Sequence, residues 1–286
     1  TQSASQKMVV ADNMISNEPS NNIDDERILI PVKYPECADS LLGLALLIRN
    51  PKLKRELIAL NVVYDDADVA TNQAKGKRLL EKLSRDAAAS EVPVTTQVRV
   101  AVNIANGIKH AFQEFNASEI IIGMHTHQEV STKFWGEFHQ SLFNGINCQI
   151  IMARITEPLN TIRRIQVAVP SRAQFEPGFH RWVERLARIS ALLECKIQFH
   201  GRQDTLDLIQ EYLVNKHPDV RVEYTEMEHW NMLPQLAASI NEDHMFVIVT
   251  ARTGTVSYKN AQERLPEEIK QFFSGKNLMI IFPDQY

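Results

Sequence analysis

The chain has 286 residues, more than one average domain requires, and 44% of them are hydrophobic, enough to fill two cores. Its formal net charge of −4 does not favour a nucleic-acid-binding protein, which usually presents a basic patch or stripe. The longest apolar run, Leu41–Ile48, is far shorter than the roughly 20 residues of a bilayer-spanning helix, so we expect no direct membrane insertion of this chain.

The first 25 residues have the composition of a linker. The stretch SNEPSNNIDDE, which ends at Glu26, combines turn formers and charges without hydrophobic periodicity. The chain also starts with Thr1 rather than Met. We therefore expect residues 1–25 to be a polar linker that follows an upstream segment.

Short apolar runs alternate with amphipathic segments from residue 26 to residue 156. The expected strands are Ile28–Val32, Leu57–Val63, Val94–Val100, Glu119–Gly123 and Cys148–Ala153. The expected helices are a segment capped by Asp39 and stopped by Asn50-Pro51, then Asn72–Ala88, Ile104–Phe115 and a helix near Phe134–Phe143.

The same series then runs again from residue 164 to residue 286. The expected strands are Ile165–Val169, Lys196–His200, Val220–Thr225, Met245–Thr250 and Leu278–Phe282. The expected helices are Phe179–Leu193, Leu206–Asn215, Leu233–Ile240 and Glu267–Phe273.

The spacing of the two series indicates a duplication. Ile28 and Ile165 are 137 positions apart, and Cys148 and Asn277 are 129 apart, with every element type matching between them. Alternating strands and helices predict an α/β fold, in which each repeat has a parallel sheet flanked by helices. We expect repeat one at 26–156, a linker at 157–163 that contains Pro158, and a degenerate repeat two at 164–286.

The three cysteines, Cys37, Cys148 and Cys195, are too few and too odd in number for a disulfide framework. We expect a reducing compartment, and we interpret each cysteine as a small buried hydrophobic residue.

Ligands of open α/β sheets bind beyond the carboxyl ends of the strands. In repeat one, Lys33 follows the first strand, Gly123 ends the fourth, and Gly136 lies where a helix would begin. Glycine lets a ligand approach the backbone, and a helix N-terminus attracts phosphate. Two glycines at one spacing are by themselves a weak signal.

The ILIPVK opening and the pattern Gly123-x2-Thr126-x9-Gly136 resemble the universal stress protein family, whose fold is adenine nucleotide alpha hydrolase-like. Nucleotide-binding members carry Gly-x2-Gly-x9-Gly followed by Ser or Thr, and an Asp after the first strand. This chain has Thr126 at the second glycine, Glu137 at the hydroxyl position and Lys33 at the Asp position. The resemblance implies a ligand that is an adenine nucleotide (ATP or AMP) or another small anion. The candidate ligand loop comprises Lys33, Val62, Gly123, Met124, Thr126 and Gly136.

Repeat two departs further from that pattern. After its fourth strand it reads Thr250-Ala251-Arg252-Thr253-Gly254-Thr255, with no Gly-x9-Gly spacing. We interpret Arg252 as a solvated loop arginine and expect any sensing to lie in repeat one.

A closer resemblance covers Glu26 to Tyr286. ERILIPVKYPE after a polar linker, and ARTGTVSYKNAQERLPEEIKQFFSGKNLMIIFP near the end, are similar to the cytoplasmic C-terminal region of bacterial sodium (cation)/proton antiporters. In those proteins two universal-stress-like repeats follow a transporter domain. The resemblance implies a transporter domain of the same polypeptide as partner, a homodimer, and a place on the cytoplasmic side of the bacterial inner membrane.

The remaining motifs favour neither a metal site nor an enzyme. His125 and His127 are two neighbours where a metal needs three or four ligands, although histidines there also suit a pH sensor. No P-loop, Gly-x-Gly-x-x-Gly, Gly-x-Ser-x-Gly or Cys-x-x-Cys motif occurs. We interpret Glu228-His229-Trp230 as a helix start in which Trp230 packs. We therefore expect no catalytic residue and no metal.

In the family, two such units pair about a two-fold axis through their last strands, which implies that Cys148–Ala153 lies against Leu278–Phe282 as a built-in pseudo-dimer. Both strands are too apolar for exposed sheet edges. Three functions stay open: a regulatory domain of an antiporter, a ligand-free dimerisation module, and a free-standing tandem universal stress protein.

Overall fold

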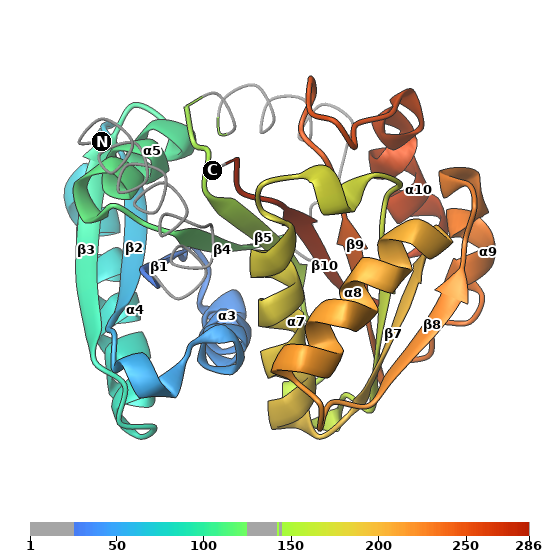
Figure 1. Cartoon of the computed structure of the whole chain (residues 1–286). Helices are drawn as coiled ribbons and strands as arrows, with labels where there is room; N and C mark the ends of the chain where they lie inside the picture. The colour runs from blue at the N-terminus through green and yellow to red at the C-terminus, as the bar shows by residue number, and fades with distance from the viewer. Residues whose placement is uncertain (1–25, 125–141, 143–144, 286) are drawn as a thin grey trace, which may run out of the picture.

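A single ten-stranded sheet runs through the whole molecule (Figure 1). The computed structural model describes residues 26–124, 142 and 145–285. The strand order is β3-β2-β1-β4-β5-β10-β9-β6-β7-β8. We call residues 26–154 the first half and residues 164–285 the second half. From its outer edge to the centre, each half has the order third, second, first, fourth and fifth strand.

The first half contains five parallel strands and, in its described part, three helices longer than one turn. The strands are β1 (Ile28–Pro31), β2 (Leu57–Tyr64), β3 (Val94–Ala101), β4 (Glu119–Gly123) and β5 (Gln149–Arg154). The helices are α3 (Pro35–Ile48), α4 (Val69–Ala88) and α5 (Ile104–Phe115). The helix expected near Phe134–Phe143 lies outside the described residues, apart from Leu142.

The second half repeats this series. The strands are β6 (Arg164–Ala168), β7 (Lys196–Gly201), β8 (Val222–Glu226), β9 (His244–Val249) and β10 (Asn277–Phe282). The helices are α7 (Phe179–Leu193), α8 (Gln203–Lys216), α9 (Leu233–Ala237) and α10 (Leu265–Phe272). The predicted α/β class, with a mostly parallel sheet flanked by helices, is confirmed.

The two halves join through their last strands, as predicted. β5 and β10 pair antiparallel, with Ile151 opposite Ile281 and Met152 opposite Ile280. All six residues of β10 are buried, as are the first five of β5. Pairing covers two apolar edges that would otherwise expose unpaired backbone groups.

Two apolar layers sandwich the sheet, and each extends across both halves. Residues of α3, α4, α7 and α8 pack on one face, and residues of α5, α9 and α10 on the other. Within β1, Ile28 and Ile30 join the first layer and Leu29 the second, because successive side chains of a strand point to opposite faces. The halves therefore share their cores.

Two predictions made from single residues are wrong. Asp39 does not cap α3, because the helix begins a turn earlier at Pro35, after Tyr34. Proline suits a first helical position, where its missing N–H is not needed. Arg252 is not solvated: it is buried, and its guanidinium donates to the carbonyls of Ile146 and Cys148 in the first half. It therefore helps to join the two halves.

The cysteines are free, with Cys148 and Cys195 buried and Cys37 half-buried. In the described ranges, no helix combines the length and the apolar character that a bilayer crossing demands.

Candidate functional site

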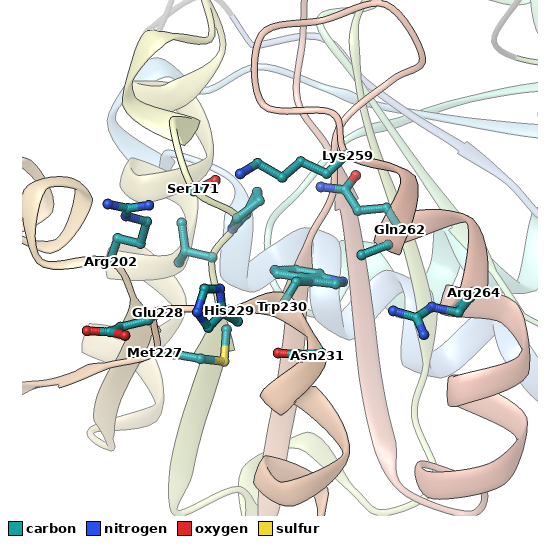
Figure 2. Close-up of a pocket in the computed structure, with 13 residues that line it drawn as sticks. Ser171, Arg202, Met227, Glu228, His229, Trp230, Asn231, Lys259, Gln262 and Arg264 are labelled. Atoms are coloured by element: carbon teal, nitrogen blue, oxygen red, sulfur yellow. The ribbon is translucent and has the colours of Figure 1, made fainter.

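A cavity of about 230 Å³ opens at the carboxyl edge of the second half (Figure 2). Its walls come from the segments that follow β6, β7, β8 and β9. These four strands are parallel neighbours, so their carboxyl ends meet at one edge of the sheet. The lining residues are Val169, Pro170, Ser171, Arg202, Met227, Glu228, His229, Trp230, Asn231, Lys259, Ala261, Gln262 and Arg264.

Basic side chains dominate the charge of this pocket. Arg202, Lys259 and Arg264 line it against a single carboxylate, Glu228. Arg202 has an acidic neighbour, with its Nε 3.8 Å from Asp204 Oδ1. Neither Lys259 nor Arg264 forms an ion pair with any other described residue. A small anion would therefore meet a net positive field.

An aromatic ring lies among these charges. Trp230 begins a short 3-10 helix (Trp230–Met232) and packs against the apolar layer beneath. Its Nε1–H is buried and has no hydrogen-bond partner within the described part of the chain. An indole in a basic pocket can pack against a planar part of a ligand, while the basic side chains attract its negative charge.

Hydrogen bonds hold the walls of the pocket in place. The buried Gln262 side chain donates from Nε2 to the Ser257 carbonyl (3.2 Å) and accepts from the Ala251 N–H (3.2 Å). Ser257 also donates from its hydroxyl to Glu176 Oε1 (2.6 Å), in the segment between β6 and α7. The opposing walls are thus tied to each other.

The backbone of β7 comes close to the segment after β6 at this edge of the sheet. A Cβ on Gly201 would lie 3.3 Å from the Val169 carbonyl oxygen, tighter than most side-chain contacts. The ladder continues past the strand ends, since the N–H of Met227 donates to the Gly201 carbonyl at 2.7 Å. Glycine therefore lets β7 approach the β6 loop at the rim of the pocket.

The candidate ligand residues of the first half lie at the matching edge. Lys33 follows β1 and is exposed, with its Nζ 5.5 Å from the ring centroids of both Tyr34 and Tyr64. Val62 of β2 packs against Gly107 of α5, where a Cβ would come within 2.6 Å of Val62 Cγ1. Val62 therefore sets a close helix-to-sheet contact.

The structure describes half of the predicted glycine loop. Gly123 ends β4, next to β1, and Met124 is buried, with its N–H donating to the Ala153 carbonyl at 2.8 Å. Thr126 and Gly136 lie outside the described residues. The ligand loop of the first half stays a prediction.

Metal binding has no support in the described part of the chain. His125, His127 and His139 lie outside it, and the residues within it contain no group of three or more His, Cys, Asp or Glu side chains that could hold a metal ion.

Sequence reasoning missed most of the pocket. It singled out Glu228-His229-Trp230 but interpreted the triplet as a helix start, and Trp230 does pack there. No sequence motif marked Lys259 and Arg264 as binding residues, because they are exposed charged residues in a long segment between two elements. One signal could have found them: basic residues follow several strands of repeat two, and those strand ends converge.

Comparison with known proteins supports the fold of both halves. Residues 26–154 match the model of the Universal stress protein family. No curated protein sequence matches the chain.

Three solved structures are similar over almost the whole chain. A universal stress protein from Archaeoglobus fulgidus is 14% identical with a TM-score of 0.60, over 91% of this chain and 96% of that one. The cytoplasmic domain of a prokaryotic cation chloride cotransporter is 8% identical with a TM-score of 0.61, over the same shares. A functionally unknown protein from Pseudomonas aeruginosa is 14% identical with a TM-score of 0.59, over 92% and 95%. At these identities the likeness concerns the fold.

Proposed function

We propose that the chain is a regulatory module on the cytoplasmic side of a bacterial membrane cation transporter of the cation/proton antiporter kind, and that it senses a small anion without turning it over. The observation that carries the proposal is the basic pocket of the second half. Its support comes from the three basic side chains, the tryptophan and the tied walls. The similar fold of a cotransporter's cytoplasmic domain supports the transporter context.

The size of the pocket decides the class of ligand. At about 230 Å³ it is smaller than the 300–1,000 Å³ typical of sites for drug-sized ligands. Pyrophosphate, or the phosphates of a mononucleotide with the base partly outside, would fit. The same charges attract any compact polyanion, so the ligands to compare are pyrophosphate, AMP and ATP.

Isothermal titration of the 286-residue chain with these three ligands tests the site. Lys259→Ala and Arg202→Ala should each weaken binding about tenfold, because each removes a charge-assisted contact of about 1.5 kcal/mol. Lys77→Ala, an exposed lysine on α4 of the first half, is the matched control and should leave the affinity unchanged. If none of the three ligands binds, the alternative function, a ligand-free dimerisation module, is favoured.

Lys259→Ala, compared with a replacement of Gly123, distinguishes binding in the two halves. The predicted loop around Gly123, Thr126 and Gly136 would bind in the first half, so its binding would survive Lys259→Ala and be lost when Gly123 is replaced. Ligand that binds only when Lys259 is present assigns sensing to the second half.

The proposal that the chain binds its ligand without hydrolysing it can be tested separately. ATP incubated with the chain should be recovered intact by ion-exchange chromatography. Hydrolysis that Lys259→Ala abolishes would contradict the non-enzymatic proposal.

The transporter context is tested by the coding sequence upstream of Thr1. We expect it to encode several hydrophobic segments long enough to cross a bilayer, joined to the folded part through residues 1–25. A short upstream sequence without such segments would favour a free-standing tandem universal stress protein.

A further inference from the structure

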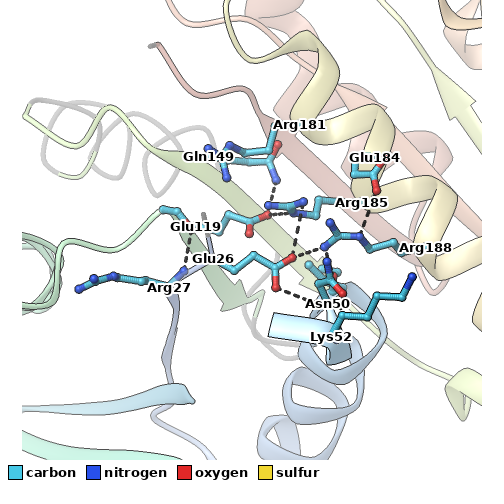
Figure 3. A network of polar contacts seen from close by, with 12 residues as sticks. Glu26, Arg27, Asn50, Lys52, Glu119, Gln149, Arg181, Glu184, Arg185 and Arg188 are labelled. Carbon is cyan, nitrogen blue, oxygen red and sulfur yellow. Dashed lines mark hydrogen bonds and ion pairs between the residues drawn. The ribbon is translucent and has the colours of Figure 1, made fainter. Parts of the chain in front are cut away.

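A buried cluster of charges joins the two halves (Figure 3). Arg185 of α7 donates from Nε to Glu119 Oε1 at 2.7 Å, and its Nη1 lies 3.6 Å from Glu26 Oε1. Gln149 donates to the same Glu119 oxygen at 2.9 Å. The side chains of Arg185 and Glu119 are fully buried, and that of Glu26 is 1% exposed. Charges this deep persist only when they are paired.

The cluster continues toward the surface through Arg188 and Glu184. Arg188 pairs with Glu26 and also donates from Nη1 to the Ile48 carbonyl at 3.1 Å. Its Nε lies 3.3 Å from Glu184 Oε1. We call Glu26, Glu119, Gln149, Glu184, Arg185 and Arg188 the seam cluster.

The outer end of the seam cluster is held by α8. Tyr212 donates its hydroxyl to Glu184 Oε2 at 2.6 Å, and His217 Nε2 lies 2.6 Å from the same oxygen. Burial raises the pKa of the Glu184 carboxyl, but the hydrogen bonds from His217 and Tyr212 and the charges of His217 and Arg188 outweigh it and lower the pKa to about 2. Glu184 therefore stays an anion that binds α7 to α8.

The inner end lies where residues 1–25 join the folded chain. Glu26 lies two positions before β1, and its Oε2 accepts from the Asn50 N–H at 2.7 Å. The beginning of the first half is thus held by Asn50 of its own half and by Arg185 and Arg188 of α7 in the second half.

The segments that lead into these two helices, α7 and α8, line the pocket. Val169–Ser171 line it and lead through residues 172–178 into α7, and Arg202 lines it immediately before α8. The segments that lead into α7 and α8 are linked, since the Thr205 hydroxyl donates to Gln174 Oε1 at 2.7 Å. With 15 residues, α7 is about 22 Å long and transmits a displacement as a rigid rod.

We infer that α7 and α8 couple occupation of the pocket to the position of Glu26, so that anion binding in the second half changes how firmly the beginning of the first half is held. The inference rests on the proposed function, because the signal is the anion of that pocket. An anion that draws Arg202 toward the 169–171 loop brings the starts of both helices together. Because the Arg188–Glu26 contact is either made or lost, a small shift gives a discrete response.

Hydrogen exchange of the full chain, followed by mass spectrometry without ligand, tests the coupling. Arg188→Gln should speed exchange at least about fivefold, the low end of ordinary allosteric coupling, in residues 26–31 and also in residues 169–178. Exchange in β10 should stay unchanged, which excludes global destabilisation. Arg164→Gln is the matched control, because it removes the 2.6 Å ion pair to Glu223 in the same half without touching α7.

Faster exchange confined to residues 26–31, with residues 169–178 unchanged, would overturn the coupling. A second arm adds pyrophosphate to saturation. It should slow exchange in residues 26–31 of the natural chain but not of Arg188→Gln. If pyrophosphate binds and residues 26–31 do not respond, the coupling fails and the anion site stands. If pyrophosphate does not bind, AMP and ATP take its place in this arm; if none of the three binds, the anion site fails, and the ligand-free comparison still tests the coupling.

Discussion

The two helices that occupy equivalent places in the two halves, α3 and α7, differ in what they bury. α3 buries Ala38, Leu41, Leu42, Leu44, Ala45 and Ile48, all apolar. α7 buries apolar residues too, but it adds an arginine stripe of the buried Arg181 and Arg185 and the partly buried Arg188, spaced four and three residues apart. Residues at this spacing lie on one face of a helix.

The carboxylates that pair with Arg185, those of Glu119 and Glu26, both come from the other half, whereas Arg181 pairs with Asp284 of its own half. Glu119 of β4 pairs with Ile28 of β1 in the first half, and Met245 of β9 pairs with Ile165 of β6 in the second. Two copies of the second half would therefore place Arg185 opposite methionine, with no counter-charge. The two halves are therefore complementary at Arg185: the second supplies the cation and the first supplies its carboxylates.

We expect the largest loss of stability from a substitution that removes Arg185, the buried arginine that pairs with carboxylates of the other half. Arg185→Met should lower the free energy of unfolding by about 3–5 kcal/mol, because Glu119 would stay buried without its cation, whereas Glu26 would keep Arg188. Urea unfolding measures the loss. Adding Glu119→Gln should recover part of it, since it removes one unpaired charge.

The ion pair of Arg164 with Glu223, in which both side chains are partly exposed, provides the control. Arg164→Met should cost no more than about 1 kcal/mol, as for other solvent-exposed pairs. Similar losses for Arg185→Met and Arg164→Met would mean that the seam cluster is ordinary surface charge.

The features that the sequence predicts correctly are those that depend on residues close together in the chain. Ile104–Phe115, Glu119–Gly123 and Phe179–Leu193 agree to the residue with α5, β4 and α7. Their periodicity, and the Asn103 side chain that caps α5, are local signals. The family resemblance implied the β5–β10 pairing, and the apolar character of both strands agreed with it.

The charges of the interior were not predictable in the same way. Arg185 and Glu119 are 66 positions apart. The local sequence around a helical arginine is the same whether its side chain is exposed to solvent or paired with a buried carboxylate. Arg252 was misassigned for this reason. The pocket likewise joins Arg202, Trp230 and Lys259, which only the strand order brings together.

A smaller effect sharpens the comparison through pH. His200 of β7 is 7% exposed and hydrogen-bonds through Nε2 to Gln166 Oε1 at 3.0 Å. Burial, and then the charge of Arg164, lower the pKa of its imidazole to about 4. An unfolded histidine titrates near 6.5, so between pH 6.5 and 4 the unfolded chain binds a proton that the folded chain does not. Stability should fall by on the order of 3 kcal/mol as pH drops through this window.

Urea unfolding at pH 7 and pH 4.5 measures this term, and His200→Gln should remove it. In the described part of the first half the histidine is His110, which is exposed on α5. His110→Gln should therefore leave the pH dependence as it is. Equal effects of the two substitutions would assign the acid sensitivity to groups other than the buried histidine.

The smallest effect concerns how a helix meets the sheet in each half. In the second half the glycine is on the strand, where a Cβ on Gly201 would lie 3.7 Å from Leu206 of α8, an ordinary contact. In the first half it is on the helix, where a Cβ on Gly76 of α4 would lie 2.3 Å from Asn61 Oδ1. Asn61 is held there, since its Nδ2 donates to the Val32 carbonyl at 2.7 Å.

Gly76→Ala therefore reverses the usual sign of such a change. In an open helix, alanine for glycine stabilises by about 1 kcal/mol. Here the overlap with Asn61 should make it destabilising by about 1–3 kcal/mol in urea unfolding. In an Asn61→Ala background the overlap is gone, and the same substitution should be neutral or stabilising. A loss of the same size in both backgrounds would show that the strand-side amide does not set the distance between α4 and β2.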